Sequence, residues 1–224
     1  MYKRLLRVIK REKIKYPNKS KFEILSVRFI EMTKAKLSQI AMDVKKDSTF
    51  TSSDDLFMCS LFPKKVLDTV LLELKPKSVL DVGCGVGISL EYLINNNIDA
   101  WGIENSTLAI SNSKVKSRII KHNLKKVLNL NKKFDLVWCY EVIEHIHPKY
   151  EEFFLTSLMN HSDKILISAA KPGQGGHGHF NEKEPAYWIE RFKKMGYIYD
   201  HKFTSRVKTP MEADSENLLY FIRN

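Results

Sequence analysis

The chain has few cysteines and no long apolar run. Its three cysteines, Cys59, Cys84 and Cys139, are an odd number at spacings that match no metal-binding pattern. Such a set argues against a disulfide scaffold and favours a reducing compartment, so we expect a cytoplasmic protein. No stretch of about eighteen apolar residues occurs, which argues against a membrane-spanning helix. The sequence also lacks internal repeats and low-complexity tracts.

Most of the formal net charge of +11 comes from the first part of the chain. Residues 1–46 hold fourteen Lys and Arg residues against four Asp and Glu residues, and the remainder is close to neutral. Because lysine far outnumbers arginine, the excess also fits a general compositional bias, and it is weak evidence for a polyanionic partner. A length of 224 residues suits one doubly wound domain with an appendage. We expect a basic helical extension with a lid over residues 1–60 and the main domain over residues 61–224.

The basic extension is predicted to contain two helices. Residues 1–14 place apolar side chains on one side of a helical wheel and basic side chains on the other. This helix has three interpretations: it docks on the main domain, it meets RNA, anionic lipid or an acidic partner, or it is an organelle presequence. Many lysines and few hydroxyl residues weaken the last one. A second helix is predicted over residues 22–42, and the polar residues 47–55 suggest a lid or a hinge.

A strand, a glycine-rich turn and a helix follow one another at residues 78–93. Residues 78–82 are apolar and rich in β-branched side chains, and they lie between Pro76 and Gly83, which indicates a buried strand. Three glycines then alternate with other residues before apolar side chains resume at helical spacing. Glycines let a ligand approach the backbone, and the first N–H groups of a helix attract polar or anionic groups. The turn either binds a nucleotide-type ligand or only connects two elements.

The glycine spacing distinguishes this turn from a dinucleotide site, which has the pattern G-x-G-x-x-G. Here the pattern is Asp-x-Gly-x-Gly-x-Gly, and it resembles the first motif of class I S-adenosylmethionine-dependent methyltransferases. The resemblance implies that the turn holds the methionine moiety of the donor, with the acidic residue near its amino group. The residues that it assigns to donor binding here are Asp81, Gly83, Cys84, Gly85 and Gly87.

Two further residues are assigned to the donor by their positions. A second strand is predicted over residues 98–103 and ends in Glu104, about twenty residues beyond the glycines, where a carboxylate accepts hydrogen bonds from both ribose hydroxyls. The alternative is a solvent-exposed loop acid. Asn123 falls where related methyltransferases carry an acidic residue next to the adenine. A side-chain amide also pairs with a base, but a plain polar loop explains this position nearly as well.

A strong strand over residues 134–140 leads into the sequence EVIEHIHP, residues 141–148. This segment resembles the fourth motif of the same superfamily. Its Glu-x-x-Glu-His form is shared by ubiquinone-biosynthesis O-methyltransferases and by small-RNA 2′-O-methyltransferases. In a helical turn, Glu141, Glu144 and His145 face one side at i, i+3 and i+4. In the RNA group, two glutamates, the histidine and a later histidine bind a divalent cation. In the alternative without metal, Glu141 contacts the donor and His145 acts as a base or a hydrogen-bond partner.

The most unusual stretch is KPGQGGHGHFNE, residues 171–182, which follows a predicted strand over residues 164–170. A loop so rich in glycine can press its backbone against a substrate. His177 and His179 are candidate general bases, and His179 is also the candidate later ligand of Mg²⁺ or Mn²⁺. The loop resembles the His-x-Phe-Glu pattern of the RNA enzymes only loosely, and it looks more like methyltransferases of glycans or small molecules. The alternative is a histidine pair that caps a turn.

The remaining pattern predicts the fold class. Helices are predicted over residues 63–74, 110–115, 150–159 and 184–195, and further strands over residues 117–120, 197–199 and 217–222. The last two strands are separated by an irregular linker, and they resemble the antiparallel sixth and seventh strands of class I methyltransferases. We therefore expect an α/β fold with a Rossmann-like, seven-stranded, doubly wound sheet and an N-terminal helical extension.

The predicted function is transfer of a methyl group from S-adenosylmethionine by direct displacement. Oxygen is the preferred acceptor, because a hydroxyl needs deprotonation or metal polarisation and the histidine-rich segments supply both. The favoured partner is a small molecule or a glycan hydroxyl. The first alternative is a metal-dependent RNA ribose 2′-O-methyltransferase, with RNA bound through the basic N-terminal region. The second alternative is a non-catalytic relative that binds the cofactor or a partner protein.

Overall fold

The structure is a computed structural model that describes residues 62–176, 178–208 and 216–224. The chain divides into two units, Met1–Asp47 and Ser48–Asn224, and every described residue lies in the second. The expected helices over residues 1–14 and 22–42, the expected lid, the boundary near residue 60, Cys59 and His177 lie outside the described residues. These expectations therefore stay predictions.

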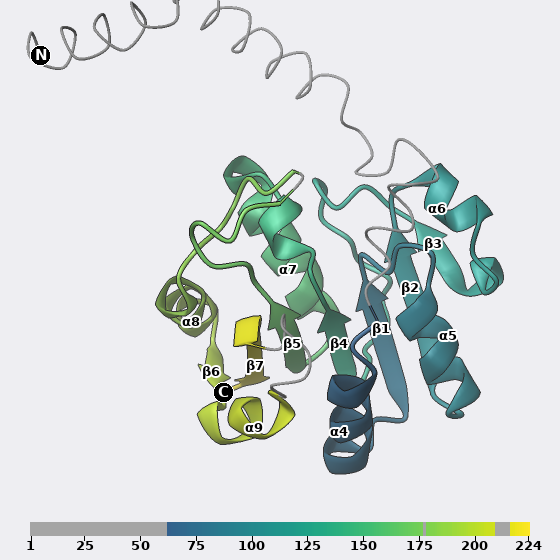
Figure 1. Cartoon of the computed structure of the whole chain (residues 1–224), viewed down its shortest axis with the longest axis horizontal. Helices are drawn as coiled ribbons and strands as arrows, with labels where there is room; N and C mark the ends of the chain where they lie inside the picture. The colour runs from purple at the N-terminus through teal and green to yellow at the C-terminus, as the bar shows by residue number, and fades with distance from the viewer. Residues whose placement is uncertain (1–61, 177, 209–215) are drawn as a thin grey trace, which may run out of the picture. The chain divides into compact units, whose positions relative to one another are not determined.

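The described residues form one mixed sheet with helices on both faces (Figure 1). The strand order is β3-β2-β1-β4-β5-β7-β6. The first five strands in this order are parallel, and β7 is antiparallel to both of its neighbours, β5 and β6. The strands are β1 (Ser78–Val82), β2 (Asp99–Glu104), β3 (Ile119–Lys121), β4 (Leu136–Cys139), β5 (Lys164–Ser168), β6 (Tyr197–Tyr199) and β7 (Leu218–Arg223). The predicted seven-stranded, Rossmann-like fold is confirmed.

Most helices match the expected positions. They are α4 (Lys64–Leu74), α5 (Ile88–Asn95), α6 (Thr107–Ser111), α7 (Glu151–His161), α8 (Pro185–Lys194) and α9 (His201–Val207), with short 3-10 turns η1 (Lys116–Arg118), η2 (Ile143–His145) and η3 (Pro148–Tyr150). The helix predicted over residues 110–115 begins earlier, because Ser106 caps it by accepting the Ala109 N–H at 3.2 Å. Within the described residues, none of these helices has the length and apolar character needed to cross a membrane.

Helix α9 occupies the first part of the segment that the sequence predicted as an irregular linker between the last two strands. The Asp200 side chain caps its first turn by accepting the Phe203 N–H at 2.8 Å. Phe203, Thr204 and Val207 are buried in the helix, and the Thr204 hydroxyl accepts the Tyr220 N–H of β7 at 3.1 Å. Only seven residues long, the helix has too few turns for a clear periodic signal, so tertiary contact with β7 decides its formation.

The central strands are buried on both faces, so their side chains alternate between two cores. In β4, Leu136 and Trp138 pack with α4, α5 and α9, whereas Val137 and Cys139 pack with α7 and α8 on the opposite face. Strand β7 shows the same alternation. Burial on both faces therefore explains the continuous apolar runs in the sequence. Packing in both cores also fixes the ends of neighbouring strands relative to one another.

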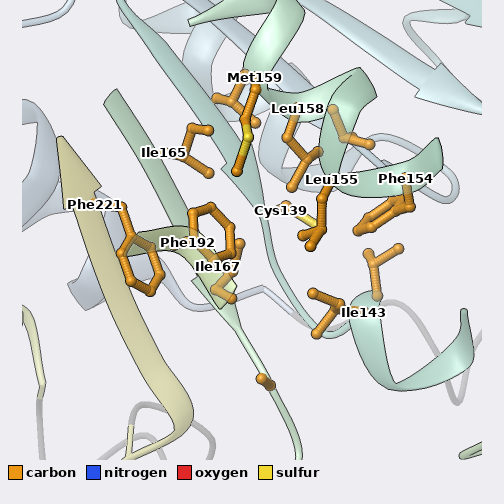
Figure 2. Packing of buried hydrophobic residues seen from close by; sticks show 14 of the residues in the cluster. Cys139, Ile143, Phe154, Leu155, Leu158, Met159, Ile165, Ile167, Phe192 and Phe221 are labelled. Atoms are coloured by element: carbon orange, nitrogen blue, oxygen red, sulfur yellow. The ribbon is translucent and has the colours of Figure 1, made fainter. Parts of the chain in front are cut away.

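Figure 2 shows the core between the sheet and helices α7 and α8. The Phe192 ring of α8 is completely buried and stacks on Phe221 of β7, with centroids 3.9 Å apart and planes inclined by 6°. Replacing Phe192 with Ala is expected to lower the free energy of unfolding by about 3–5 kcal/mol, because it removes the contact and leaves a cavity. Urea unfolding measures the loss. Ile198→Ala is the control: Ile198 is 56% exposed, and its replacement should cost under about 0.5 kcal/mol.

Candidate active site at the carboxyl ends of the parallel strands

Strands β1, β2, β4 and β5 run in one direction, so the segments that follow them meet at one edge of the sheet. Open α/β sheets bind their ligands at this edge. The segments are the glycine turn at 83–87, the tip of β2 with Glu104, the residues from 140 to 145, and the loop from 169 to 182. Every described candidate residue except Asn123 and Asp81 lies on one of these segments, and Asp81 lies in β1 directly before the glycine turn.

The glycine turn is fixed to the end of β2 by backbone hydrogen bonds. The Gly83 and Cys84 N–H groups both donate to the Ile103 carbonyl, at 2.8 and 3.1 Å. Gly83 has a φ of +79°, and a Cβ there would lie 2.5 Å from the Val142 side chain. A side chain at this position would therefore strain the backbone and collide with the segment that follows β4. The Cys84 side chain packs over Gly102, and its Sγ lies 3.8 Å from the Gly85 carbonyl.

Glu104 joins the glycine turn to the tip of β2. Its carboxylate is 8% exposed and accepts three backbone N–H groups: Gly85 at 3.0 Å on Oε2, and Asn105 at 2.7 Å and Ser106 at 2.6 Å on Oε1. Burial raises the pKa of Glu104, and the three N–H groups oppose that shift. A carboxylate offers about four acceptor positions, so one remains on Oε2. The assignment of Glu104 to the ribose hydroxyls stays a prediction, which this free acceptor position allows for one hydroxyl without loss of a backbone contact.

Asp81 carries a buried oxygen without a hydrogen-bond partner. Its side chain is 3% exposed, and Oδ2 makes no hydrogen bond. Burial, reinforced by the charge of Glu104, raises the pKa of Asp81 to about 8. An unpaired buried carboxylate oxygen is costly, and a ligand with N–H donors and positive charge would remove that cost. The amino group of S-adenosylmethionine has both properties, so the residues of this turn fit the donor.

The raised pKa of Asp81 predicts how the stability of the ligand-free protein depends on pH. The folded protein binds this proton more tightly than the unfolded chain, whose pKa is near the ordinary 3.8. The stabilising contribution is therefore complete below about pH 4 and is lost as pH rises through about 8. We expect Asp81→Asn to stabilise the ligand-free protein at pH 9 by about 1–3 kcal/mol, since no buried charge forms.

Urea unfolding at pH 5, 7 and 9 tests this expectation. The stability difference between Asp81→Asn and the wild type should grow with pH. Glu190→Gln serves as the control, because its carboxylate is 54% exposed and pairs with Lys194 across one helical turn at 3.8 Å. Parallel pH curves for Asp81→Asn and the wild type would contradict the assigned burial of a charge.

Asn123 lies next to the tip of β2 but uses its side-chain oxygen locally. The neighbouring His122 N–H donates to the Glu104 carbonyl at 2.9 Å, which holds this loop beside β2. The Asn123 Oδ1 accepts the Lys125 N–H at 2.9 Å and shapes a turn. Its assignment to the adenine stays a prediction that depends on the remaining NH₂ group.

The end of β4 is tied to the end of β5 by Glu141 and Ser168. Glu141 adopts a left-handed conformation with φ of +54°. Its N–H donates to the Ser168 Oγ at 2.6 Å, and that hydroxyl donates to the Glu141 Oε1 at 2.6 Å. The helical turn that was expected to begin at Glu141 begins two residues later, as η2. Glu141 precedes η2, and its carboxylate contacts Ser168, whereas Glu144 within η2 is completely buried.

Glu144, His145 and His179 converge beside this turn. Each offers one potential ligand atom, and these atoms lie within 4.8 Å of one another. The two imidazole rings meet edge to face, with centroids 4.9 Å apart and planes inclined by 85°. His145 Nδ1 lies 3.2 Å from the Gly178 carbonyl. Three of the four predicted metal-binding residues are thus brought together, and Glu141 lies outside this group.

The glycine-rich loop is held against η2 by its own backbone. The Phe180 and Asn181 N–H groups donate to the Glu144 carbonyl, at 2.8 and 3.0 Å. Glu182 accepts the Gly173 N–H at 2.8 Å and the Gly175 N–H at 2.7 Å, and its Oε1 lies 3.0 Å from His179 Nδ1. Sequence reasoning assigned no role to Glu182 or to Ser168. The only sequence signal was position: Glu182 lies three residues after His179, and Ser168 lies at the end of β5.

Comparisons with known proteins agree with this fold. A family model described as a methyltransferase domain matches residues 57–170. No curated protein matches the chain. Among solved structures, the methyltransferase domain of bacterial CtHen1-C shares 17% identity and covers 72% of this chain and 98% of its own, with a TM-score of 0.54. Magnesium protoporphyrin IX methyltransferase from Synechocystis PCC 6803, with bound SAH, shares 17% identity and covers 72% and 83%, with a TM-score of 0.56.

The plantazolicin methyltransferase BpumL, in complex with a pentazolic desmethylPZN analog and SAH, extends the comparison over more of the chain. It shares 18% identity and covers 88% of this chain and 93% of its own, with a TM-score of 0.52. These three structures share the fold, and the matched family model covers half of the sequence. The chain therefore belongs to the methyltransferase domain family, within the class I superfamily whose members transfer a methyl group from S-adenosylmethionine.

Proposed function

We propose that this enzyme O-methylates a small molecule or a sugar hydroxyl. The observation that carries the proposal is the pair of imidazoles, His145 and His179, whose rings lie 4.9 Å apart at the edge of the sheet where the donor site is built. A hydroxyl is a poor nucleophile at neutral pH until its proton is removed, and imidazole is the side chain that most often acts as a general base there. An amine acceptor would not need this pair.

The proposed mechanism is an in-line displacement at the sulfonium methyl of the donor. Asp81 and the glycine turn hold the methionine moiety, and Glu104 holds the ribose. The glycine-rich loop covers the acceptor and excludes water, while His179 or His145 takes the hydroxyl proton as the oxygen attacks. The protein contributes alignment and proton removal, since the positive charge on sulfur already makes the methyl group reactive.

An untargeted labelling experiment tests the acceptor class. The purified protein is incubated with S-adenosylmethionine carrying a labelled methyl group and with cell extract, and the products are separated into RNA, protein, lipid and small-molecule fractions. We expect label in the small-molecule or glycan fraction, as the methyl ether of a hydroxyl group. Label confined to RNA or protein would contradict the proposal.

A second candidate is metal-dependent ribose 2′-O-methylation of RNA. The observation in its favour is the convergence of Glu144, His145 and His179 within 4.8 Å. One carboxylate and two imidazoles suit Mn²⁺ better than Mg²⁺, because Mg²⁺ prefers oxygen ligands. These three residues would hold the cation, which would polarise the ribose hydroxyl. Two solved structures with similar folds are described as the methyltransferase domain of bacterial CtHen1-C and as small RNA methyltransferase HEN1.

Chelation separates the two candidates. Removing divalent cations with EDTA should leave transfer to a small molecule unchanged and should abolish the RNA reaction. Re-addition of Mn²⁺ then restores the RNA reaction. Transfer that resists EDTA, together with unlabelled RNA, would remove the second candidate.

A further inference from the structure

Glu182 occupies a position at which only a carboxylate satisfies its surroundings. Three donors converge on its two oxygens: the Gly173 N–H on Oε2, and the Gly175 N–H and His179 Nδ1 on Oε1. Two of these donors are backbone groups that cannot reverse their polarity. A glutamine would offer one oxygen and one NH₂ group, so at least one N–H of the loop would face another donor. The side chain is 19% exposed, so water replaces these contacts poorly.

The same three contacts define the shape of the loop. Gly173 and Gly175 both have positive φ, +88° and +69°, and their N–H groups point inward to one carboxylate. Loop conformation and the position of His179 therefore depend on one side chain.

His179 is also confined by Gly176. A Cβ added to Gly176, where φ is +157°, would lie 2.4, 2.6 and 2.7 Å from Nε2, Cε1 and Cδ2 of the imidazole. Near-equal distances to these three atoms place that Cβ over the face of the ring. Gly176 thus lies against the face of the ring close to Nε2. The ring is held at Nδ1 by Glu182 and at its face by Gly176.

We propose that Glu182 is a positioning residue that acts through His179: its carboxylate accepts the Nδ1–H, so the neutral imidazole presents its lone pair at Nε2. A carboxylate cannot donate, so the 3.0 Å contact at Nδ1 requires the proton on that nitrogen. In water the neutral imidazole favours the other tautomer, with the proton on Nε2 and no lone pair there. Carboxylate partners fix ring orientation and basicity in this way at many sites. The inference rests on the proposed role of His179.

Nuclear magnetic resonance of the ¹⁵N-labelled imidazoles tests the tautomer directly, with EDTA present so that no cation fixes it. His179 is assigned by the signal that disappears in His179→Asn. We expect the wild type to carry the His179 proton on Nδ1 and Glu182→Gln to move it to Nε2. The variant should transfer methyl about 10- to 100-fold more slowly, with donor affinity unchanged. Glu184→Gln is the control, because this exposed glutamate makes no side-chain cap for α8.

Gly176→Ala is a second variant, because Glu182→Gln alters the whole loop. The added methyl should displace the His179 ring and slow transfer while Glu182 remains. Gly173 also has a positive φ, +88°, but a Cβ there meets nothing within 4 Å, so Gly173→Ala tests backbone strain in the loop without displacement of the ring. A wild-type His179 with its proton on Nε2, or a Glu182→Gln variant with unchanged tautomer and rate, would overturn the proposal. The tautomer is read without any acceptor, so a wrong proposed function would not alter this result.

Discussion

Replacing Glu104 with Ala is expected to weaken binding of S-adenosylmethionine about 30- to 700-fold. The substitution removes the proposed hydrogen bond to the ribose and releases the Gly85 N–H, which the carboxylate holds at 3.0 Å. One hydrogen bond to a charged group contributes about 1.5–3 kcal/mol. Release of the Gly85 N–H adds to this loss, so we expect a total of about 2–4 kcal/mol. Isothermal titration calorimetry with the purified protein measures the dissociation constant. Asp81→Ala should weaken binding in the same direction through loss of the contact to the amino group.

The matched control for Glu104→Ala is Glu91→Ala. Glu91 lies in the first turn of α5, in the same segment of the chain, and pairs with Lys114 at 3.7 Å on the surface. This exposed pair contributes little, so the dissociation constant should change less than about threefold. If Glu104→Ala and Asp81→Ala both retain wild-type affinity, the donor does not lie across the ends of β1 and β2.

Replacing His179 with Asn is expected to slow methyl transfer about 100- to 10,000-fold, the range for loss of a general base. Asn removes the basic Nε2 but keeps a polar side chain of smaller size in the loop. Donor affinity should stay within about threefold of the wild type, because the residues assigned to the donor are Asp81, Glu104 and the glycine turn. Initial rates of label transfer at saturating donor measure the effect.

His122→Asn is the control for this substitution. His122 is a histidine beside β2 whose Nε2 lies 3.1 Å from the Lys126 carbonyl, and it belongs to neither the imidazole pair nor the glycine-rich loop. Its replacement should leave the rate nearly unchanged. Equal rates for His179→Asn and the wild type would show that this imidazole removes no proton, and would shift the role to His145.

The sequence predicted the elements whose boundaries are marked locally. Strand β1 was predicted without error, because Pro76 and Gly83 delimit a continuous apolar run. Helix α9 was missed, because its formation depends on contact with a strand that follows it in the chain. The division of side chains between two cores was also inaccessible, since a strand buried on both faces shows no alternation in sequence.

The sequence predicted the strands that carry Asp81 and Glu104 better than the backbone that follows β4 and β5. Asp81 and Glu104 lie in or next to strands, and the pairing of β1 with β2 places Asp81 opposite Gly102 in parallel register. Side-chain direction after β4 was harder to predict, because the left-handed backbone at Glu141 turns its carboxylate to Ser168. Glu182 contacts residues that lie three, seven and nine positions earlier in an irregular loop. The sequence of such a loop has no periodicity from which these contacts could be predicted.

The position of β7 between β5 and β6 has a consequence for protein synthesis. β6 pairs only with β7 among the described strands, although it leaves the ribosome first. Until residues 218–223 emerge, β5 presents an unpaired edge and the Phe192 ring has no stacking partner. During this interval the nascent chain exposes the unpaired edge of β5, which is prone to aggregation. We expect chaperones to engage at this stage, and the donor site to acquire its final rigidity only when the last strand inserts.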